Sequence, residues 1–172
     1  MTRTLVVTSL VAAACALASL SDDAMADEPA DMARAKQFWK TLAKGDTDGL
    51  KKFYAPKIVL KAGSELLKPR WGLTKQADRS KDLLVDRDDL LRGYGRMING
   101  IGKEKWSQVF ARIKKDKIHV STAGKDDQPF AGIKLGDTIL KVASGPGDDT
   151  LYFILRKDKD GKLRVHLEST DY

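Results

Sequence analysis

The sequence predicts an α+β fold in which N-terminal helices pack on a curved, mostly antiparallel sheet. Helical periodicity dominates residues 32–54, near the start of the chain. Strand-like runs fill the last third, and the final two flank a polar tip that contains Asp160 and Gly161, a strong hairpin signal. Helices that precede a run of strands, instead of alternating with them, segregate to one face of a sheet.

Two helices are predicted first. Apolar residues recur at three- and four-residue steps over 32–44, and Gly45 follows as a left-handed C-cap would. Asp46 is positioned to cap a second short helix over 47–54, which we expect Pro56 to end. Residues 57–62 then form a strand by composition.

The middle of the chain carries weaker patterns. Residues 63–85 mix charges and predict a loop, in which Trp71 is expected to cover something apolar. Asp86 or Asp88 can cap a third helix that runs to about Met97 or Ile98. Residues 105–113 fit both helical and strand spacing, and we favour a helix for the first part.

Four strands are expected after this point, over 117–122, 138–143 and the two arms of the final hairpin. In the last arm, Leu163, Val165 and Leu167 alternate with polar residues, so strict alternation places the three on one face. Arg164, His166 and Glu168 then share the other face. The pattern leaves open which of these faces meets the helices.

The N-terminus predicts export. Arg3 precedes an apolar stretch over 5–20, and Ala24-Met25-Ala26 offers a small-residue cleavage site, so residues 1–26 are interpreted as a secretory signal peptide and 27–172 as one domain. The only cysteine, Cys15, lies in the apolar stretch; the alternative is a lipid anchor at Cys15. No later segment is apolar enough for a membrane span. We expect a periplasmic or secreted protein.

Charge favours solubility more than nucleic-acid binding. Removal of residues 1–26 would take away one basic and two acidic side chains and raise the formal net charge from +7 to +8. The basic residues are spread along the chain and not gathered in one block, so no nucleic-acid surface is expected. The predicted domain has no thiol pair for a disulfide or thiolate metal site.

The segments described above resemble the NTF2-like superfamily, which includes ketosteroid isomerases and SnoaL-like cyclases. The residues that carry the resemblance are Phe38-Trp39, Ala43 to Asp46, Gly49-Leu50, Phe53 to Pro56, Ile58 to Leu60 and the hairpin over 151–167. The resemblance implies a cone-shaped fold with a pocket between the concave sheet face and the helices. It also implies that a homodimer is a candidate assembly.

The resemblance argues against steroid isomerisation. The positions that correspond to the oxyanion-binding tyrosine and the aspartate base of ketosteroid isomerases are Phe38 and Ala62. Phenylalanine has no hydroxyl to stabilise an enolate, and alanine cannot accept a proton. Both roles are therefore unfilled in this chain.

Candidate pocket residues are aromatic side chains and one histidine. They are Phe38, Trp39, Tyr54, Trp71, Tyr94, Trp106 and His119. His119 and His166 alternate with apolar neighbours, so they lie either on the convex surface or in the pocket. Asp86, Asp88 and Asp89 are interpreted as helix-start residues. No catalytic residue is assigned, and no metal or cofactor is predicted.

We therefore expect a non-catalytic exported domain that binds a small apolar ligand or acts as an accessory domain of the cell envelope. One alternative is a lyase, isomerase or cyclase that uses the same pocket. Another is an interaction module that dimerises through an exposed sheet face.

Overall fold

A computed structural model describes residues 29–64, 67, 81–125, 132–143 and 150–171. The predicted signal peptide, Cys15 and Trp71 lie outside these residues. The described elements are α1 (Ala30–Ala43), α2 (Thr47–Leu50), β1 (Tyr54–Leu60), β2 (Leu83–Asp86), α3 (Arg87–Ile101), α4 (Lys103–Ala111), the short 3-10 helix η3 (Lys115–Lys117), β3 (Ile118–Thr122), β4 (Thr138–Ala143), β5 (Thr150–Lys157) and β6 (Leu163–Asp171).

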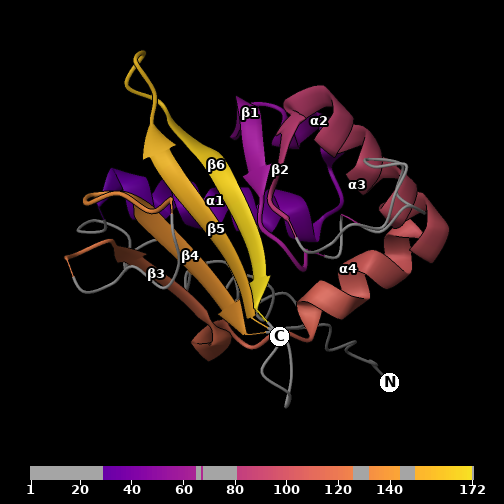
Figure 1. Cartoon of the computed structure of the whole chain (residues 1–172). Coiled ribbons are helices and arrows are strands. Elements are labelled where there is room, and N and C mark those ends of the chain that lie inside the picture. The colour runs from indigo at the N-terminus through magenta and orange to yellow at the C-terminus, as the bar shows by residue number, and fades with distance from the viewer. Residues whose placement is uncertain (1–28, 65–66, 68–80, 126–131, 144–149, 172) are drawn as a thin grey trace, which may run out of the picture.

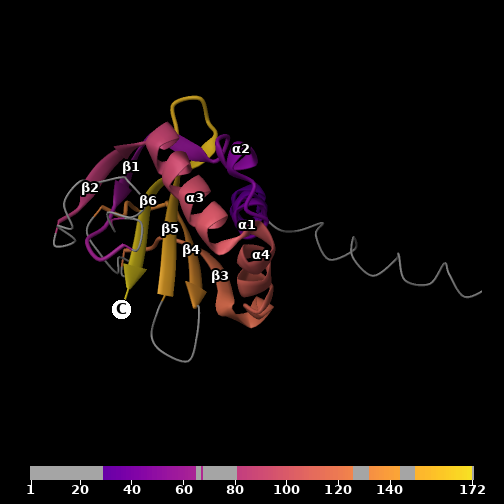
Figure 2. The same cartoon turned by 90° about the vertical axis from the view of Figure 1, so that its right-hand side faces the viewer.

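The strands form one mixed, curved sheet in the order β2-β1-β6-β5-β4-β3. All neighbours are antiparallel except β1 and β6, which run parallel. Figures 1 and 2 show α1, α3 and α4 on one face of the sheet, whose edge strands do not meet. The predicted fold class, N-terminal helices on a curved and mostly antiparallel sheet, is confirmed.

The turn between the first two helices has the predicted chemistry. Gly45 adopts a left-handed conformation with φ of 64°, and the Asp46 side chain accepts a 2.9 Å hydrogen bond from the backbone N–H of Gly49. The second helix is shorter than predicted, however, because Tyr54 already begins β1. Pro56 lies in that strand, just before the ladder with β2 begins at Lys57. Its missing N–H therefore breaks no bond of that ladder.

The loop predicted over 63–85 ends in an edge strand, β2, which the sequence interpretation missed. The third helix also runs further than predicted, to Ile101, and Gly102 with φ of 90° separates it from α4. Asp86 stands at the N-cap position of α3, but its side chain pairs with Lys57 at 2.8 Å instead of capping. The helical interpretation of the segment after 105 is confirmed by α4.

The sheet is buried on both faces, to different extents. The main core lies between the helices and the sheet. A smaller cluster on the other face is covered by residues that follow β3; its buried members are Ala123, Ile133, Ile139, Tyr152, Ile154 and Leu167. Asp137 and Arg156 fasten this covering segment through two hydrogen bonds of 2.8 and 2.6 Å.

Candidate functional site

Strand β6 contains a bulge at His166, and the bulge determines which side chains reach the interior. Val165 pairs with Leu155 of β5, whereas Leu167 pairs with the adjacent residue Ile154. Two residue steps on β6 thus match one on β5, which interrupts the alternation of side chains. Val165 packs in the main core, and Leu167 packs in the cluster on the other face. The prediction that Leu163, Val165 and Leu167 share one face is therefore wrong.

The same bulge turns Glu168 toward the helices. Its side chain is only 4% exposed, although Asp and Glu are rarely this deeply buried in proteins. Tyr54, from the start of β1, donates its hydroxyl hydrogen to Oε1, and Tyr94, from α3, donates to Oε2 at 2.9 Å. Each carboxyl oxygen thus has one tyrosine donor, and the group joins three elements that are distant in the sequence.

Burial controls the protonation of this group. Burial raises the pKa of Glu168 to about 7, although the two tyrosine hydrogen bonds act in the opposite direction. Burial and the neighbouring Glu168 charge raise the pKa of both tyrosine hydroxyls well above the ordinary value. Of these three groups, only Glu168 therefore changes its protonation state near neutral pH.

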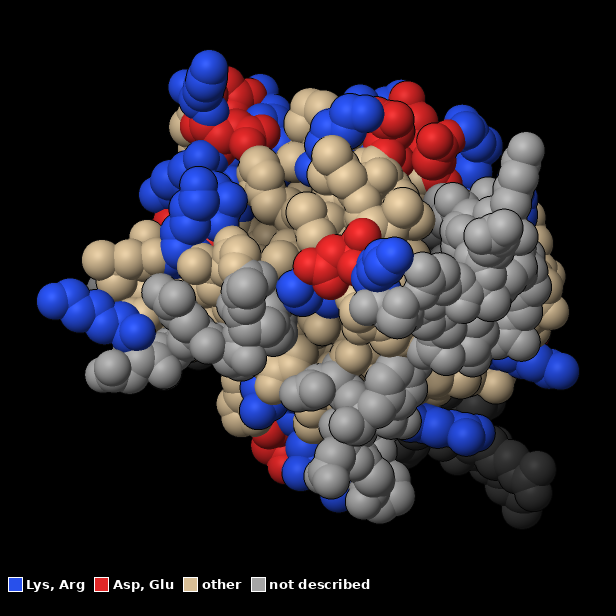
Figure 3. Space-filling view, viewed as in Figure 1, with Lys and Arg blue, Asp and Glu red and all other residues tan. Residues whose placement is uncertain are grey.

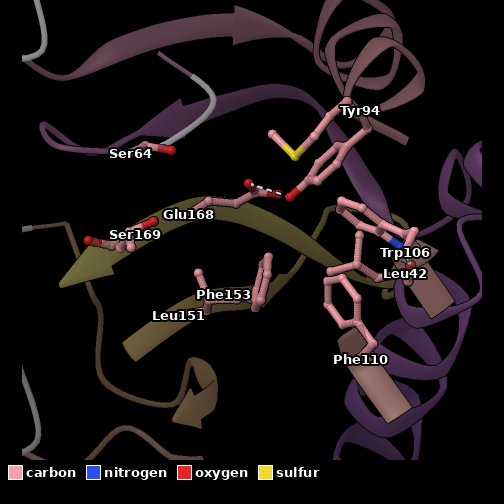
Figure 4. A pocket seen from close by; sticks show the side chains of 11 residues that line it. Leu42, Ser64, Tyr94, Trp106, Phe110, Leu151, Phe153, Glu168 and Ser169 are labelled. Carbon is pink, nitrogen blue, oxygen red and sulfur yellow. Dashed lines mark hydrogen bonds between the residues drawn. The ribbon is translucent and has the colours of Figure 1, made fainter. Parts of the chain in front are cut away.

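Glu168 lies in the wall of a pocket of about 200 Å³ between the helices and the open end of the β5–β6 hairpin, where β5 begins and β6 ends (Figure 4). Most of the lining is apolar. The lining residues are Leu42, Ser64, Tyr94, Met97, Trp106, Phe110, Leu151, Phe153, Glu168, Ser169 and Thr170. Phe110, Leu151, Ser169 and Thr170 are half-buried, whereas the others are buried, so these four lie toward the mouth.

The helices hold the aromatic wall in place. The indole N–H of Trp106 donates to the carbonyl oxygen of Leu42 at 2.8 Å, which fixes the α4 side chain against α1. The Trp106 ring lies 4.6 Å from the Phe110 ring and 6.5 Å from the Tyr94 ring, centroid to centroid, with the latter pair nearly perpendicular. Phe153 faces them from β5 (Figure 4). The wall is thus assembled from two helices and the sheet.

The predicted pocket residues are distributed among several environments. Tyr94 and Trp106 line the pocket, and Tyr54 lies behind Glu168 as its second donor. Phe38 and Trp39 are buried in the main core, where the Phe38 ring lies 5.0 Å from that of Phe153. His119 is exposed on β3, opposite Lys141.

Sequence reasoning missed Glu168, the only carboxylate among the described residues that line the pocket. Alternation grouped it with Arg164 and His166, and the run of residues 163–168 contains no glycine or other sign of a bulge. His166 itself lies outside the pocket. Its Nε2 is 2.7 Å from Oδ1 of Asp158, in the charged tip of the hairpin.

This hairpin tip gathers charged side chains of both signs. Basic and acidic side chains lie together at the top left of Figure 3, where the β5–β6 turn projects in Figure 1. Arg164 pairs with both Asp158 and Asp160. The histidine and its carboxylate are therefore part of a surface ion-pair network at the far end of the hairpin from the pocket.

Metal and membrane signals are weak in the part of the chain that the structure describes. There, no three His, Cys, Asp or Glu side chains gather in a way that could hold a metal ion. Among the same residues, no helix combines the length and apolar character that crossing a bilayer requires.

No family model and no curated relative matches this chain. Among solved structures, it is similar to a DUF4783 family protein from Bacteroides fragilis YCH46, with 14% identity, 84% of this chain and 98% of that chain covered, and a TM-score of 0.38. It is also similar to a designed NTF2-like protein that carries five substitutions, with 15% identity, 82% of this chain and 97% of that chain covered, and a TM-score of 0.36. Because these identities and TM-scores are low, the fold is described from the strand order and register of this chain itself.

Proposed function

We propose that this protein is a binding domain that holds a small, mainly apolar molecule in the pocket beside Glu168 and does not transform it. One observation carries the proposal: among the described lining residues, one buried carboxyl group stands in a mostly apolar wall that contains four aromatic rings. Apolar walls with a few oriented polar groups are typical of ligand sites. The apolar part provides affinity, and the carboxyl group fixes the orientation of the ligand.

The size of the pocket supports a small ligand. Protein interiors contain few voids larger than a water molecule, so a space of about 200 Å³ is large for a packing defect. Sites for drug-sized molecules occupy roughly 300–1,000 Å³. The ligand is accordingly expected to be smaller than a typical drug and smaller than a steroid.

The binding proposal can be tested by native mass spectrometry of the protein purified from its own source. We expect a co-purifying small molecule that is lost in the variant Leu151→Trp, because the larger side chain fills the mouth of the pocket. Leu135→Trp is the matched control, since Leu135 is 66% exposed and does not line the pocket. A wild-type protein that carries no small molecule and binds none from a metabolite mixture would contradict the proposal.

A second candidate is proton-transfer catalysis by a lyase, isomerase or cyclase. It is favoured by the pKa of Glu168, because a general base works best when its pKa is near the operating pH. Tyr94 could then act as a hydrogen-bond donor to the reacting molecule. Incubation of the identified ligand with wild-type protein and with Glu168→Gln would distinguish the two candidates: conversion by the wild type alone would establish catalysis.

Export and self-association complete the proposal. We propose a mature chain that starts at Asp27 and works in the periplasm or outside the cell, on the basis of the N-terminal sequence pattern. Mass measurement of the mature N-terminus would distinguish this from lipidation at Cys15. The homodimer stays a prediction, and light scattering that gives a monomer at high concentration would remove it.

A further inference from the structure

Glu168 is a buried carboxyl group that has no basic partner among the residues that the structure describes. Its two hydrogen-bond donors, Tyr54 and Tyr94, are both neutral, and no Lys, Arg or His of the described ranges forms an ion pair with it. Lys61, which directly follows β1, donates its backbone N–H to the Glu168 carbonyl oxygen, but its ammonium group pairs with Asp82 at 2.6 Å. An ionised carboxylate in this position is costly unless a positive charge joins it.

The pocket beside this carboxyl group is walled by aromatic rings. Tyr94, Trp106 and Phe110 come from the helix side, and Phe153 comes from the sheet (Figure 4). The Tyr94 and Trp106 rings stand at 84° to each other and so form a corner. Faces of aromatic rings attract cations, and this attraction strengthens when the cation leaves water. The aromatic wall and the carboxyl group therefore both favour a positively charged ligand.

We propose that the pocket binds a small organic cation, an amine or quaternary ammonium compound, with Glu168 as its counter-charge and the aromatic rings around its apolar groups. This inference rests on the proposed binding function and names the ligand class. A cation with a hydrocarbon surface satisfies both the apolar wall and the carboxylate. The volume of about 200 Å³ accommodates about seven non-hydrogen atoms, judged against about 30 Å³ per liquid water molecule.

Inorganic cations do not suit this site. Calcium and magnesium require about six oxygen ligands and bind mainly to carboxylates, carbonyl groups and water, whereas the described lining offers one carboxylate. Its other side-chain oxygens are the neutral hydroxyl groups of Tyr94, two serines and Thr170. Aromatic carbon cannot replace the missing oxygens. The chemistry of the wall thus separates an organic ammonium ion from a hydrated metal ion.

Binding should follow the ionisation of Glu168. The titratable groups that face this carboxyl group are Tyr54 from β1 and Tyr94 from α3, whereas β5 presents Phe153 and α4 presents Trp106. Both tyrosines stay protonated near neutral pH. Affinity for a permanently charged cation should therefore rise as Glu168 loses its proton.

The test compares two probes by isothermal titration calorimetry of the purified protein. The probes are choline and its neutral carbon isostere, in which a tert-butyl group replaces the trimethylammonium group. At about pH 8, where Glu168 is mostly ionised, we expect choline to bind at least roughly tenfold more tightly than the isostere, a difference typical of a desolvated cation–π and ion-pair site. In Glu168→Gln, most of this difference should disappear, whereas the isostere should bind much as before.

Glu104→Gln is the matched control, because Glu104 is an exposed carboxylate on α4 outside the pocket. It should leave the preference for choline unchanged. If Glu168→Gln fails to fold, the wild type provides the second measurement: its choline affinity should fall at least several-fold as the pH is lowered through about 7.

Equal binding of the two probes, or tighter binding of the isostere, would overturn the assignment of a cation and leave the binding function intact. A choline affinity that is independent of both pH and Glu168 would also overturn it. If neither probe binds and the native protein carries no small molecule, the cation assignment and the proposed function are both wrong.

Discussion

The Tyr94 hydroxyl on α3 lies 2.9 Å from Oε2 of Glu168 on β6 and donates a hydrogen bond to it. This contact joins the helix layer to the sheet inside the pocket wall. Because Tyr54 occupies the other carboxyl oxygen, the carboxylate is held in one orientation. Its protonation depends on how many donors it keeps.

Tyr94→Phe is expected to raise the pKa of Glu168 above its value of about 7, because this hydrogen bond stabilises the charged form. The loss of one hydrogen bond to a charged group corresponds to an increase of roughly one pKa unit. Titration of the carboxyl group by carbon-13 NMR measures the change. Tyr152→Phe, in the cluster on the other sheet face, should leave this pKa unchanged; an equal shift in both variants would contradict the role of Tyr94.

Stability should fall as the pH rises through the range set by Glu168. The carboxyl group has a pKa of about 7 in the folded state and about 4.3 in the unfolded state, so the folded protein binds the extra proton. The stabilisation is fully present below the unfolded pKa and is lost by about pH 7, at about 1.4 kcal/mol per pH unit and about 4 kcal/mol in total.

Urea unfolding across this pH range measures the effect. The unfolding free energy of the wild type should fall as the pH increases, because Glu168 loses its proton. Glu168→Gln has no such proton to lose, so the variant should become more stable relative to the wild type as the pH increases. Parallel pH curves for the two proteins would show that Glu168 does not carry the proton.

Asp137→Ala should destabilise the protein by about 3 kcal/mol. The Asp137 side chain is buried and holds both Arg156 and the backbone N–H of Lys134, so its removal leaves partly buried donors without an acceptor. The exposed pair of Lys57 with Asp86 provides the control, because Lys57→Ala should cost less than about 1 kcal/mol. Chemical denaturation of both variants measures their unfolding free energies. Similar losses of stability in the two variants would contradict the prediction that the buried Asp137 matters more than the exposed pair.

Two glycines should respond in opposite directions to substitution by alanine. Gly45 has a positive φ, and an added Cβ would lie 3.3 Å from atoms of Ile98 and Trp106, so Gly45→Ala should lower the melting temperature. Gly95 lies within α3, and an added Cβ there would meet no atom within 4 Å. Gly95→Ala should stabilise the protein by about 1 kcal/mol through helix propensity. Calorimetry measures both melting temperatures, which should be lower than the wild-type value for Gly45→Ala and higher for Gly95→Ala.

Local sequence signals predicted much of the fold but not the key residue of the site. Gly45 and Asp46 marked the first helix junction because capping chemistry is local. The position of β1 was harder, because Pro56 can stand in a strand only where its missing N–H is not needed, and this depends on neighbouring strands. Tyr94 and Trp106 were recognised as candidates because large aromatic side chains rarely lack a packing or binding role.

Strict alternation of side chains along β6 would place Glu168 on the same face as Arg164 and His166. The bulge at His166 arises from the pairing of β6 with β5 on one side and β1 on the other, where the register is also interrupted. Such a mismatch is a property of three strands together and leaves no mark in six consecutive residues. For the same reason, the partnership of Glu168 with Tyr54 and Tyr94 could not be predicted from spacing.

The strand order has a consequence for how the molecule is made. Strand β6 lies between β1 and β5, so a segment that is synthesised after both of them joins β1 and β2 to the part of the sheet formed by β3, β4 and β5. Until residues 163–171 are available, β1 and β5 each present an open edge, and no closed interior can form between the two halves. Formation of the binding site should therefore be one of the final events of folding, because Glu168 arrives with the strand that completes the sheet.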